Sequence, residues 1–443
     1  MGASCQPCPD LVLCGFGKET RMDSEKILSH VCGSRGTWTH LQGFQTGQAS
    51  SLRTSTSLTM SDKEVCEENP AEYCLGGYHP VQTGEMLNRR YQVLHKVGWG
   101  YFSTVWLCRD LQKKKYVAVK VSKSGKKFTE AALDEISLLN CVNGAHKKES
   151  QGENVIQFLQ DFKLIGENGL HVCLVFELLG PSLLHLMRNH GRKGLPLTCV
   201  KRILQQVLQG LNFLHKNCRI IHTDIKPENI LICVKADNLQ QYVAEAAAWN
   251  HNRSCEGAAD GVDVNFLTHL FETGNADMLG VKIADLGSAC WTYKPFSEEI
   301  QTQQYRAPEV LLGSGYSTPA DIWSSACMAF EMATSHYLFE PQASEHFSRN
   351  DDHIACMIEL LGRIPPKIVF SGKYSSTFFN KQGDLLRVPY LYPCGLYDTL
   401  VNRHKWQKNE ALVFASFLLP MLDYTPERRA TAEKCLEHPW LQY

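Results

Sequence analysis

The spacing of hydrophobic residues changes near residue 91. Residues 1–72 show no periodic apolar pattern and carry a Ser/Thr-rich run from Ser50 to Ser61, so we expect a disordered tail. From Tyr91 onward, apolar residues alternate with polar ones and are interrupted by glycines, which indicates an antiparallel sheet. The strands that this pattern predicts cover 91–97, 104–108, 116–120 and 171–176.

Two segments instead repeat their apolar residues at helical spacing. One, 129–139, lies within the predicted sheet region, and the other, 199–215, follows it. The pattern therefore predicts an α+β fold. A small antiparallel sheet with one main helix occupies residues 73–176, and a larger, mainly helical region occupies 177–443.

The loop from His222 to Asn229 carries the chemistry around which the rest of the chain is interpreted. It places an acid, a cation and an amide at the spacing of a phosphoryl-transfer loop. Asp224 is expected to orient a substrate hydroxyl, Lys226 to neutralise charge on the moving phosphoryl group, and Asn229 to hold a metal ion. A polar surface turn is the alternative. His222 itself is predicted to be a hydrogen-bonded core histidine.

A nucleotide site is predicted in the sheet region. The Gly98-Trp99-Gly100 sequence lies between two strand patterns, which favours a flap over phosphates and disfavours a Rossmann turn. Lys120 ends the third strand and needs an anion, unless it extends to the solvent as an edge lysine. Its expected partner is Glu135 on the predicted helix, with Asp134 as the competitor.

Three further motifs lie in the second region. Glu177-Leu178-Leu179-Gly180 looks like a hinge whose backbone binds adenine. Asp285, in Asp285-Leu286-Gly287 after a short strand, is predicted to bind Mg²⁺. Glu309 is expected to pair with Arg429, and Arg428 is the adjacent alternative.

The chain from Asn229 to Asp285 is far longer than the hairpin expected between two such motifs. We therefore predict an insert at about 236–278, which includes a helix-forming patch at 244–249. A tolerated surface excursion and a regulatory or localising insert remain equally open.

Composition narrows the class of protein. The 443 residues are 44% hydrophobic, enough for a large core, and the formal net charge of -1 favours neither nucleic acid nor a membrane as partner. The 18 cysteines are scattered, which fits a reducing compartment better than a disulfide framework. No apolar run approaches the length of a membrane helix, so a soluble intracellular protein is expected.

With these motifs in place, the chain resembles the eukaryotic protein kinases, and within the CMGC group it is most similar to the SR-protein kinase family. The segments that carry the resemblance are 76–81, 98–106, 220–229, 305–309, 316–323, 338–341 and 360–362. The resemblance implies a bilobal kinase fold, ATP and Mg²⁺ as cofactors, and transfer of phosphate to serines in Arg-Ser-rich splicing factors. It also implies a cytoplasmic and nuclear location, with a monomer favoured.

The resemblance further implies which residues bind ATP. They are Val97, Gly98, Trp99, Gly100, Tyr101, Phe102, Ser103, Thr104, Val105, Ala118, Lys120, Glu135, Glu177, Leu179 and Leu231. Ser103 stands where the family pattern has its third glycine, which should stiffen the flap without removing its backbone donors.

Because the substrates implied by the resemblance are rich in arginine, we expect acidic docking positions, although the net charge of the whole chain is close to zero. The matching acids are Glu228, Glu345, Asp352 and Glu359. Asp352 and Glu359 are seven positions apart and so share a helix face, although a solvated charged face is the alternative. Two departures from the family, His336 and Gln303, predict weaker docking or altered local specificity.

Thr223 replaces the arginine that many kinases carry before the catalytic aspartate. Because that arginine normally receives a phosphate of the activation segment, we predict activity without phosphorylation. Two rival functions remain: a CMGC kinase with Ser-Pro or LAMMER-type specificity, and a pseudokinase scaffold.

Overall fold

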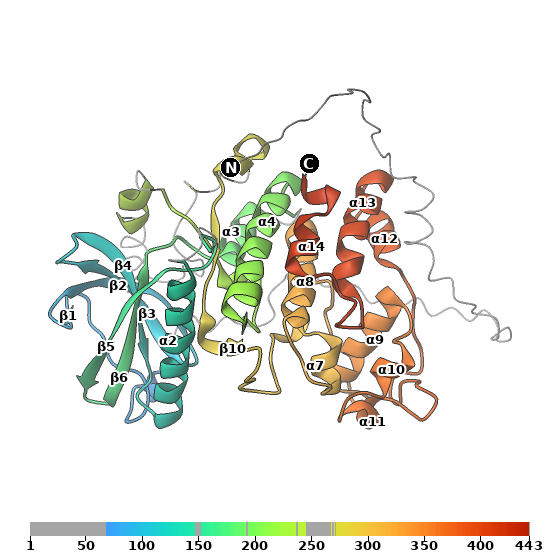
Figure 1. Cartoon of the computed structure of the whole chain (residues 1–443), viewed down its shortest axis with the longest axis horizontal. Helices are drawn as coiled ribbons and strands as arrows, with labels where there is room; N and C mark the ends of the chain where they lie inside the picture. Colours follow the sequence, from blue (N-terminus) through green and yellow to red (C-terminus); the bar gives the residue numbers. More distant parts are fainter. Residues whose placement is uncertain are drawn as a thin grey trace, which may run out of the picture. The chain divides into compact units, whose positions relative to one another are not determined.

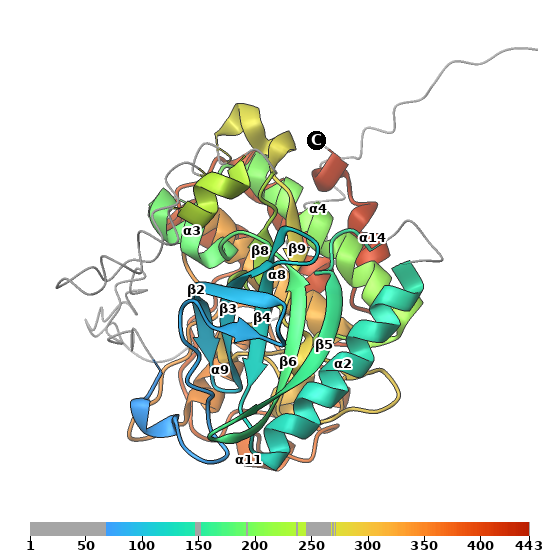
Figure 2. The same ribbon diagram turned by 90° about the vertical axis from the view of Figure 1, so that its left-hand side faces the viewer.

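A six-stranded antiparallel sheet forms the first part of the computed structural model, which describes residues 68–146, 152–191, 194–235, 238–244, 267, 270 and 272–442. The strand order is β1-β2-β3-β4-β6-β5, and Figure 2 shows the strands β2 to β6 of this sheet. The strands are β1 (Met86–Leu87), β2 (Tyr91–Gly100), β3 (Ser103–Asp110), β4 (Lys115–Ser122), β5 (Phe158–Gly166) and β6 (Gly169–Glu177). The four predicted strands are confirmed as β2, β3, β4 and β6, and each is longer than expected.

The two faces of the sheet are buried in different ways. Alternate residues of β4, such as Val117 and Val119, join an apolar cluster on one face. On the other face Leu174 of β6 packs with Leu138 and Leu139 of helix α2 (Lys126–His146). Figure 1 shows α2 lying along the sheet, as the helical pattern of 129–139 predicts.

The second part is mainly helical. Its centre is helix α8 (Pro319–Thr334), in which every residue from Ala320 to Thr334 is buried. The predicted helix at 199–215 is α4 (Leu197–Phe213), which continues into a π-helical turn, Leu214–Cys218. The other helices are α3 (Leu183–His190), α7 (Pro308–Leu312), α9 (Arg349–Leu361), α10 (Pro366–Val369), α11 (Ser375–Phe378), α12 (Leu396–Asp398), α13 (Lys408–Leu418) and α14 (Ala432–Leu436).

Two short ladders bring the chemical loops together. Strand β8 (Ile230–Ile232) pairs with β9 (Val281–Ile283), and β7 (Ile220–Ile221) pairs with β10 (Cys290–Trp291). The backbone N–H of Ala284 donates to the carbonyl oxygen of Asn229 at 2.8 Å. The ends of the catalytic loop and of the 285–287 motif are thereby fixed beside each other.

The expected tail and insert lie largely outside the described residues. Within the predicted tail, however, Glu68 is buried and Pro70–Glu72 form a 3₁₀ turn, so ordered structure begins before residue 73. Of the insert, residues 238–244 are helical with Tyr242 buried, and Thr273–Met278 form a 3₁₀ helix. None of the helices within the described ranges is long and apolar enough to cross a membrane.

Candidate active site

The catalytic loop gathers its polar side chains around one carboxylate. Lys226 Nζ lies 2.9 Å from Asp224 Oδ2, and the hydroxyl of Thr302 donates to Asp224 Oδ1 at 2.8 Å. The amide nitrogen of Asn229 donates to the backbone oxygen of Asp224 at 2.8 Å and to its Oδ2 at 3.1 Å. The three side chains named from the sequence are therefore in contact, and Thr302, which the sequence did not reveal, joins them.

A buried acid supports this loop from behind. Asp321 of α8 is fully buried, and its carboxylate accepts the backbone N–H groups of His222 at 2.9 Å and Thr223 at 2.8 Å. His222 is also fully buried, and its Nε2 lies 3.0 Å from the carbonyl oxygen of Ala284. The prediction of a core histidine is confirmed. The only sequence signal for Asp321 was its place in the 316–323 motif.

The predicted lysine–glutamate pair is present. Lys120 Nζ lies 2.8 Å from Glu135 Oε1 and 3.0 Å from Asp285 Oδ1, whereas Asp134 is exposed. Burial acts to lower the pKa of Lys120, but Asp285 and Glu135 outweigh it and raise that pKa overall. The charge of Lys120 lowers the pKa of the Asp285 carboxyl to about 2. Both groups are therefore charged at neutral pH.

Asn229 and Asp285 have the donor atoms that Mg²⁺ prefers. Because Asn229 uses its amide nitrogen to bind Asp224, its amide oxygen is left as a metal ligand. Asp285 is ionised and stands in the left-handed backbone region, with a φ of 60°, at the start of its loop. The residues present thus fit the predicted metal.

Most of the residues expected to surround ATP fall into two groups. Gly98 to Val105 belong to the β2–β3 hairpin, where Gly98 pairs with Val105 and Gly100 with Ser103. Behind the hairpin, Ala118, Leu179 and Leu231 pack in or against the same apolar cluster. This arrangement gives a glycine-containing rim and an apolar floor, which suit the phosphates and the base of a nucleotide.

Glu177 makes side-chain contacts of its own at the expected hinge. Its Oε1 accepts the backbone N–H of Gln157 at 2.7 Å and lies 2.7 Å from Lys282 Nζ. Its backbone N–H is used as well, because it donates to the carbonyl oxygen of Gln157 at 3.0 Å. The side chain and the N–H of Glu177 are therefore committed to structure.

Comparison with known proteins supports this chemistry. A model of the protein kinase domain matches residues 91–255 and 259–441. The chain is 38% identical to SRSF protein kinase 3 of Mus musculus, over 87% of this chain and 92% of that protein. This chain belongs to the SRSF protein kinase family. It is 41% identical to serine/threonine-protein kinase SRPK of Physarum polycephalum, over 85% of this chain and 91% of that protein. It is also 35% identical to protein kinase dsk1 of Schizosaccharomyces pombe, over 85% of each. The protein is thus an ATP-using serine/threonine kinase with a protein kinase fold.

The activation segment of this kinase, residues 285–309, is held by neutral contacts and by one arginine. The hydroxyl of Thr223 donates to the carbonyl oxygen of Ser288 at 2.8 Å. The side-chain amide nitrogen of Gln301 donates to the carbonyl oxygen of Ala320 at 2.8 Å. The guanidinium of Arg306 donates to the backbone carbonyl oxygen of Gln301 at 2.9 Å. The segment therefore has fixed contacts on the catalytic loop and on α8.

The end of the activation segment carries the predicted buried ion pair. Arg429 makes two parallel hydrogen bonds to Glu309, of 2.7 and 2.9 Å, and both side chains are buried. Arg428 points to the exposed side and lies 3.3 Å from Asp423. The choice of Arg429 over Arg428 is confirmed.

The structure distributes the four proposed docking acids unevenly. Glu228 and Glu345 are exposed, and Glu359 on α9 accepts the backbone N–H of Tyr392 at 3.0 Å. Asp352 is only 3% exposed, and its Oδ2 accepts the backbone N–H of Gln342 at 2.8 Å. The expectation that Asp352 lies on an open acidic face is wrong in this conformation, because residues ahead of α9 fold over it.

Both departures from the family pattern contact neighbouring elements. The amide nitrogen of Gln303 donates to Asn350 Oδ1 at 3.0 Å and lies 3.1 Å from His353 Nδ1, which ties the activation segment to α9. The ring of His336 packs edge-on against His404 at 5.1 Å. Neither residue presents an acid to a substrate.

One acid near the catalytic loop was missed in the sequence. Glu331 of α8 is fully buried, it accepts the hydroxyl of Tyr305, and it interacts electrostatically with Glu228. Burial raises the pKa of Glu331 to about 8. The available signal was an acid inside the otherwise apolar run of 326–333.

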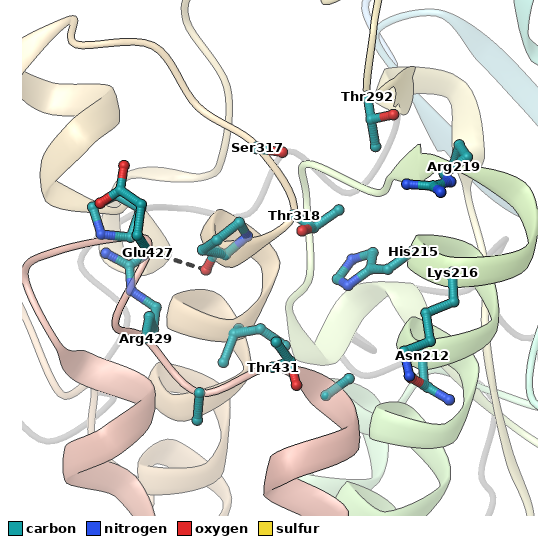
Figure 3. A pocket seen from close by; sticks show the side chains of 15 residues that line it. Asn212, His215, Lys216, Arg219, Thr292, Ser317, Thr318, Glu427, Arg429 and Thr431 are labelled. Carbon is teal, nitrogen blue, oxygen red and sulfur yellow. Dashed lines mark hydrogen bonds between the residues drawn. The ribbon is translucent and has the colours of Figure 1, made fainter.

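A cavity of about 560 Å³ lies behind the catalytic loop, between the end of α4 and the starts of α8 and α14 (Figure 3). Its wall includes His215, which lies 2.8 Å from the buried Asp321, and Arg429, which is paired with Glu309. None of the residues predicted to bind ATP lines this cavity. It is therefore separate from the nucleotide site.

Proposed function

We propose that this kinase transfers the γ-phosphoryl group of ATP to serines in Arg-Ser-rich proteins such as SR splicing factors, and thereby regulates pre-mRNA splicing. The observation that carries the proposal is Glu228, an exposed acidic residue in the same loop as Asp224, where it can meet an arginine next to the target serine. The relatives named SRSF protein kinase support the same substrate class.

Each residue of the catalytic group has a defined part in this reaction. Asp224 orients the serine hydroxyl, and Lys226, 2.9 Å away, neutralises charge that develops on the transferred group. Lys120 binds the phosphates while Glu135 holds it in place. Asn229 and Asp285 are the residues that would hold Mg²⁺, which supplies charge neutralisation at the phosphate oxygens when bound.

The proposal is tested by phosphosite mapping on an Arg-Ser-repeat peptide beside a Ser-Pro peptide of equal length. We expect faster phosphorylation of serines in the Arg-Ser peptide. Asp224→Ala should lower kcat roughly 10²- to 10⁴-fold, the usual range for a positioned acid or base. Equal or reversed peptide rates would favour a kinase with Ser-Pro or LAMMER-type specificity. ATP turnover that survives Asp224→Ala would mean that another site is responsible.

The proposed docking acids differ in burial, so the surface acids and the buried Asp352 are tested in separate variants. Glu345 is exposed and Glu359 is half-buried, so the pair Glu345→Gln/Glu359→Gln should raise KM for the Arg-Ser peptide roughly 2- to 30-fold, from about 0.2–1 kcal/mol per surface charge pair. The exposed Asp134→Asn, on α2, is the matched control and should leave KM unchanged. Asp352→Asn should be assayed separately with a measurement of stability, since this side chain is buried.

The remaining expectations concern setting. We propose that the kinase acts as a monomer in the cytoplasm and nucleus, without binding nucleic acid directly. Sedimentation of the purified protein and imaging of a tagged chain test these statements. A stable dimer, or a signal confined to membranes, would contradict them.

A further inference from the structure

The tip of the β2–β3 flap is attached to helix α2. Tyr101 and Phe102 form the two-residue turn of the hairpin, and both remain about half exposed. Their rings contact Phe128, in the first turn of α2, at centroid distances of 5.7 and 5.9 Å. Lys127 adds a hydrogen bond of 3.1 Å to the Tyr101 hydroxyl. Aromatic edge contacts of this kind stabilise by about 0.5–1.5 kcal/mol beyond their buried area.

A segment ahead of the sheet reaches the same flap from the other side. Tyr78 is 1% exposed, and its hydroxyl donates to the carbonyl oxygen of Gly100 at 2.7 Å. The backbone before Tyr78 is folded tightly, because a Cβ on Gly77 would lie 1.8 Å from the carbonyl oxygen of Glu72. Only glycine allows this close backbone approach, which lies next to the residue that meets the flap, Tyr78.

Lys123, which follows β4, joins these two attachments. It is 3% exposed, and its ammonium lies 4.3 Å from the ring centroid of Tyr78 and 4.6 Å from that of Tyr101. It also forms an ion pair with Glu72. Its backbone N–H donates to the carbonyl oxygen of Phe102 at 3.0 Å. A buried lysine between two aromatic faces is a strong cation–π arrangement.

We propose that Tyr78 and Lys123 are positioning residues that hold the flap in its phosphate-binding conformation before ATP arrives. The proposal rests on the function above, in which the flap covers the ATP phosphates. A flexible glycine-containing loop loses backbone entropy when it closes on a ligand. Contacts that order the loop in advance remove part of this cost and strengthen binding of the phosphates. The adenine site lies on other elements and should not depend on these contacts.

The test compares Tyr78→Phe with Tyr73→Phe. Each variant loses one hydroxyl from the same segment and keeps its ring, but the Tyr73 hydroxyl donates to Glu68, whereas the Tyr78 hydroxyl donates to the flap carbonyl of Gly100. For Tyr78→Phe we expect the Kd for ADP and the KM for ATP each to rise roughly 2- to 10-fold, the range for the loss of one hydrogen bond. Adenosine, which has no phosphates, should bind Tyr78→Phe and wild type equally. Tyr73→Phe should match wild type for both ligands.

A second measurement needs no nucleotide. Amide hydrogen exchange of residues 98–104 in the ligand-free protein should be faster in Tyr78→Phe than in wild type, and unchanged in Tyr73→Phe. Lys123→Met should speed exchange in the same segment, and Lys123→Arg, which keeps the charge, should restore much of the protection.

The outcomes separate the proposal from the function on which it rests. Unchanged exchange and unchanged ADP affinity in Tyr78→Phe would overturn the positioning role. Equal weakening of ADP and adenosine would also overturn it, because Tyr78 would then act through the stability of the whole sheet. If Tyr78→Phe shows faster exchange than wild type, but the wild-type protein does not phosphorylate Arg-Ser peptides, only the proposed function is overturned.

Discussion

Replacing Arg429 by methionine should destabilise the kinase strongly. The guanidinium makes two hydrogen bonds to Glu309, of 2.7 and 2.9 Å, and donates to the carbonyl oxygens of Pro319 and Asp423, both at 2.9 Å. It also lies over the ring of Trp323 at 5.1 Å. Methionine would leave the buried Glu309 carboxylate without its cation. Breaking one side of such a pair costs about 3–5 kcal/mol.

The assay is unfolding in urea, monitored by circular dichroism. Urea is uncharged and therefore does not screen the interactions between charges. Arg428→Met is the matched control, because Arg428 is an exposed neighbour whose contact with Asp423 is 3.3 Å long, and it should cost about 0–0.5 kcal/mol. The double variant Glu309→Gln/Arg429→Met should cost less than the sum of the two single variants, since it strands no charge. Strictly additive losses, or a loss for Arg429→Met no larger than that for Arg428→Met, would refute this reasoning.

Three further predictions concern the activation segment and a buried ion pair of the sheet. Protein expressed in bacteria and treated with phosphatase should be active, and activity that required phosphorylation of Thr or Tyr residues in 288–305 would contradict the role assigned to Thr223. Gln301→Ala removes buried hydrogen bonds to α8. It should lower kcat/KM at least roughly 10-fold, while a peptide substrate still binds. Unchanged kinetics would show that the activation segment does not need these hydrogen bonds. Arg90 lowers the pKa of Asp110 to about 2 from 3.8, so this pair stabilises the fold above about pH 4 and loses that contribution as the pH falls. The stability difference between wild type and Asp110→Asn should therefore shrink by about 1 kcal/mol from pH 5 to pH 3 in urea titrations, and a constant difference would contradict it.

Features set by short-range pattern could be predicted from the sequence. The strand that carries Lys120 and the helix that carries Glu135 each have a clear period, so their pairing followed once the two were placed in one sheet region. The same apolar stripe separated Glu135 from the exposed Asp134. Strand β5 was not predicted, because its buried positions do not alternate strictly with exposed ones.

Features set by long-range packing could not be predicted. Spacing alone places Asp352 and Glu359 on one face of α9, but it does not say that the backbone at Gln342 covers Asp352. Burial of Glu331 likewise depends on Tyr305, which comes from a distant segment. Burial by a partner far along the chain leaves no periodic trace at either residue.

The support of the catalytic loop explains how Asp224 is positioned without a phosphate. Both carboxylate oxygens of Asp321 are occupied, one by the N–H of Thr223 and the other by the N–H of His222 and by His215. The Thr223 hydroxyl then connects the loop to the activation segment at Ser288. These contacts use groups that are present in the unmodified chain, so no added charge is needed to complete them. We therefore expect control of this kinase to act on access of the substrate or of ATP, and not on phosphorylation of the activation segment.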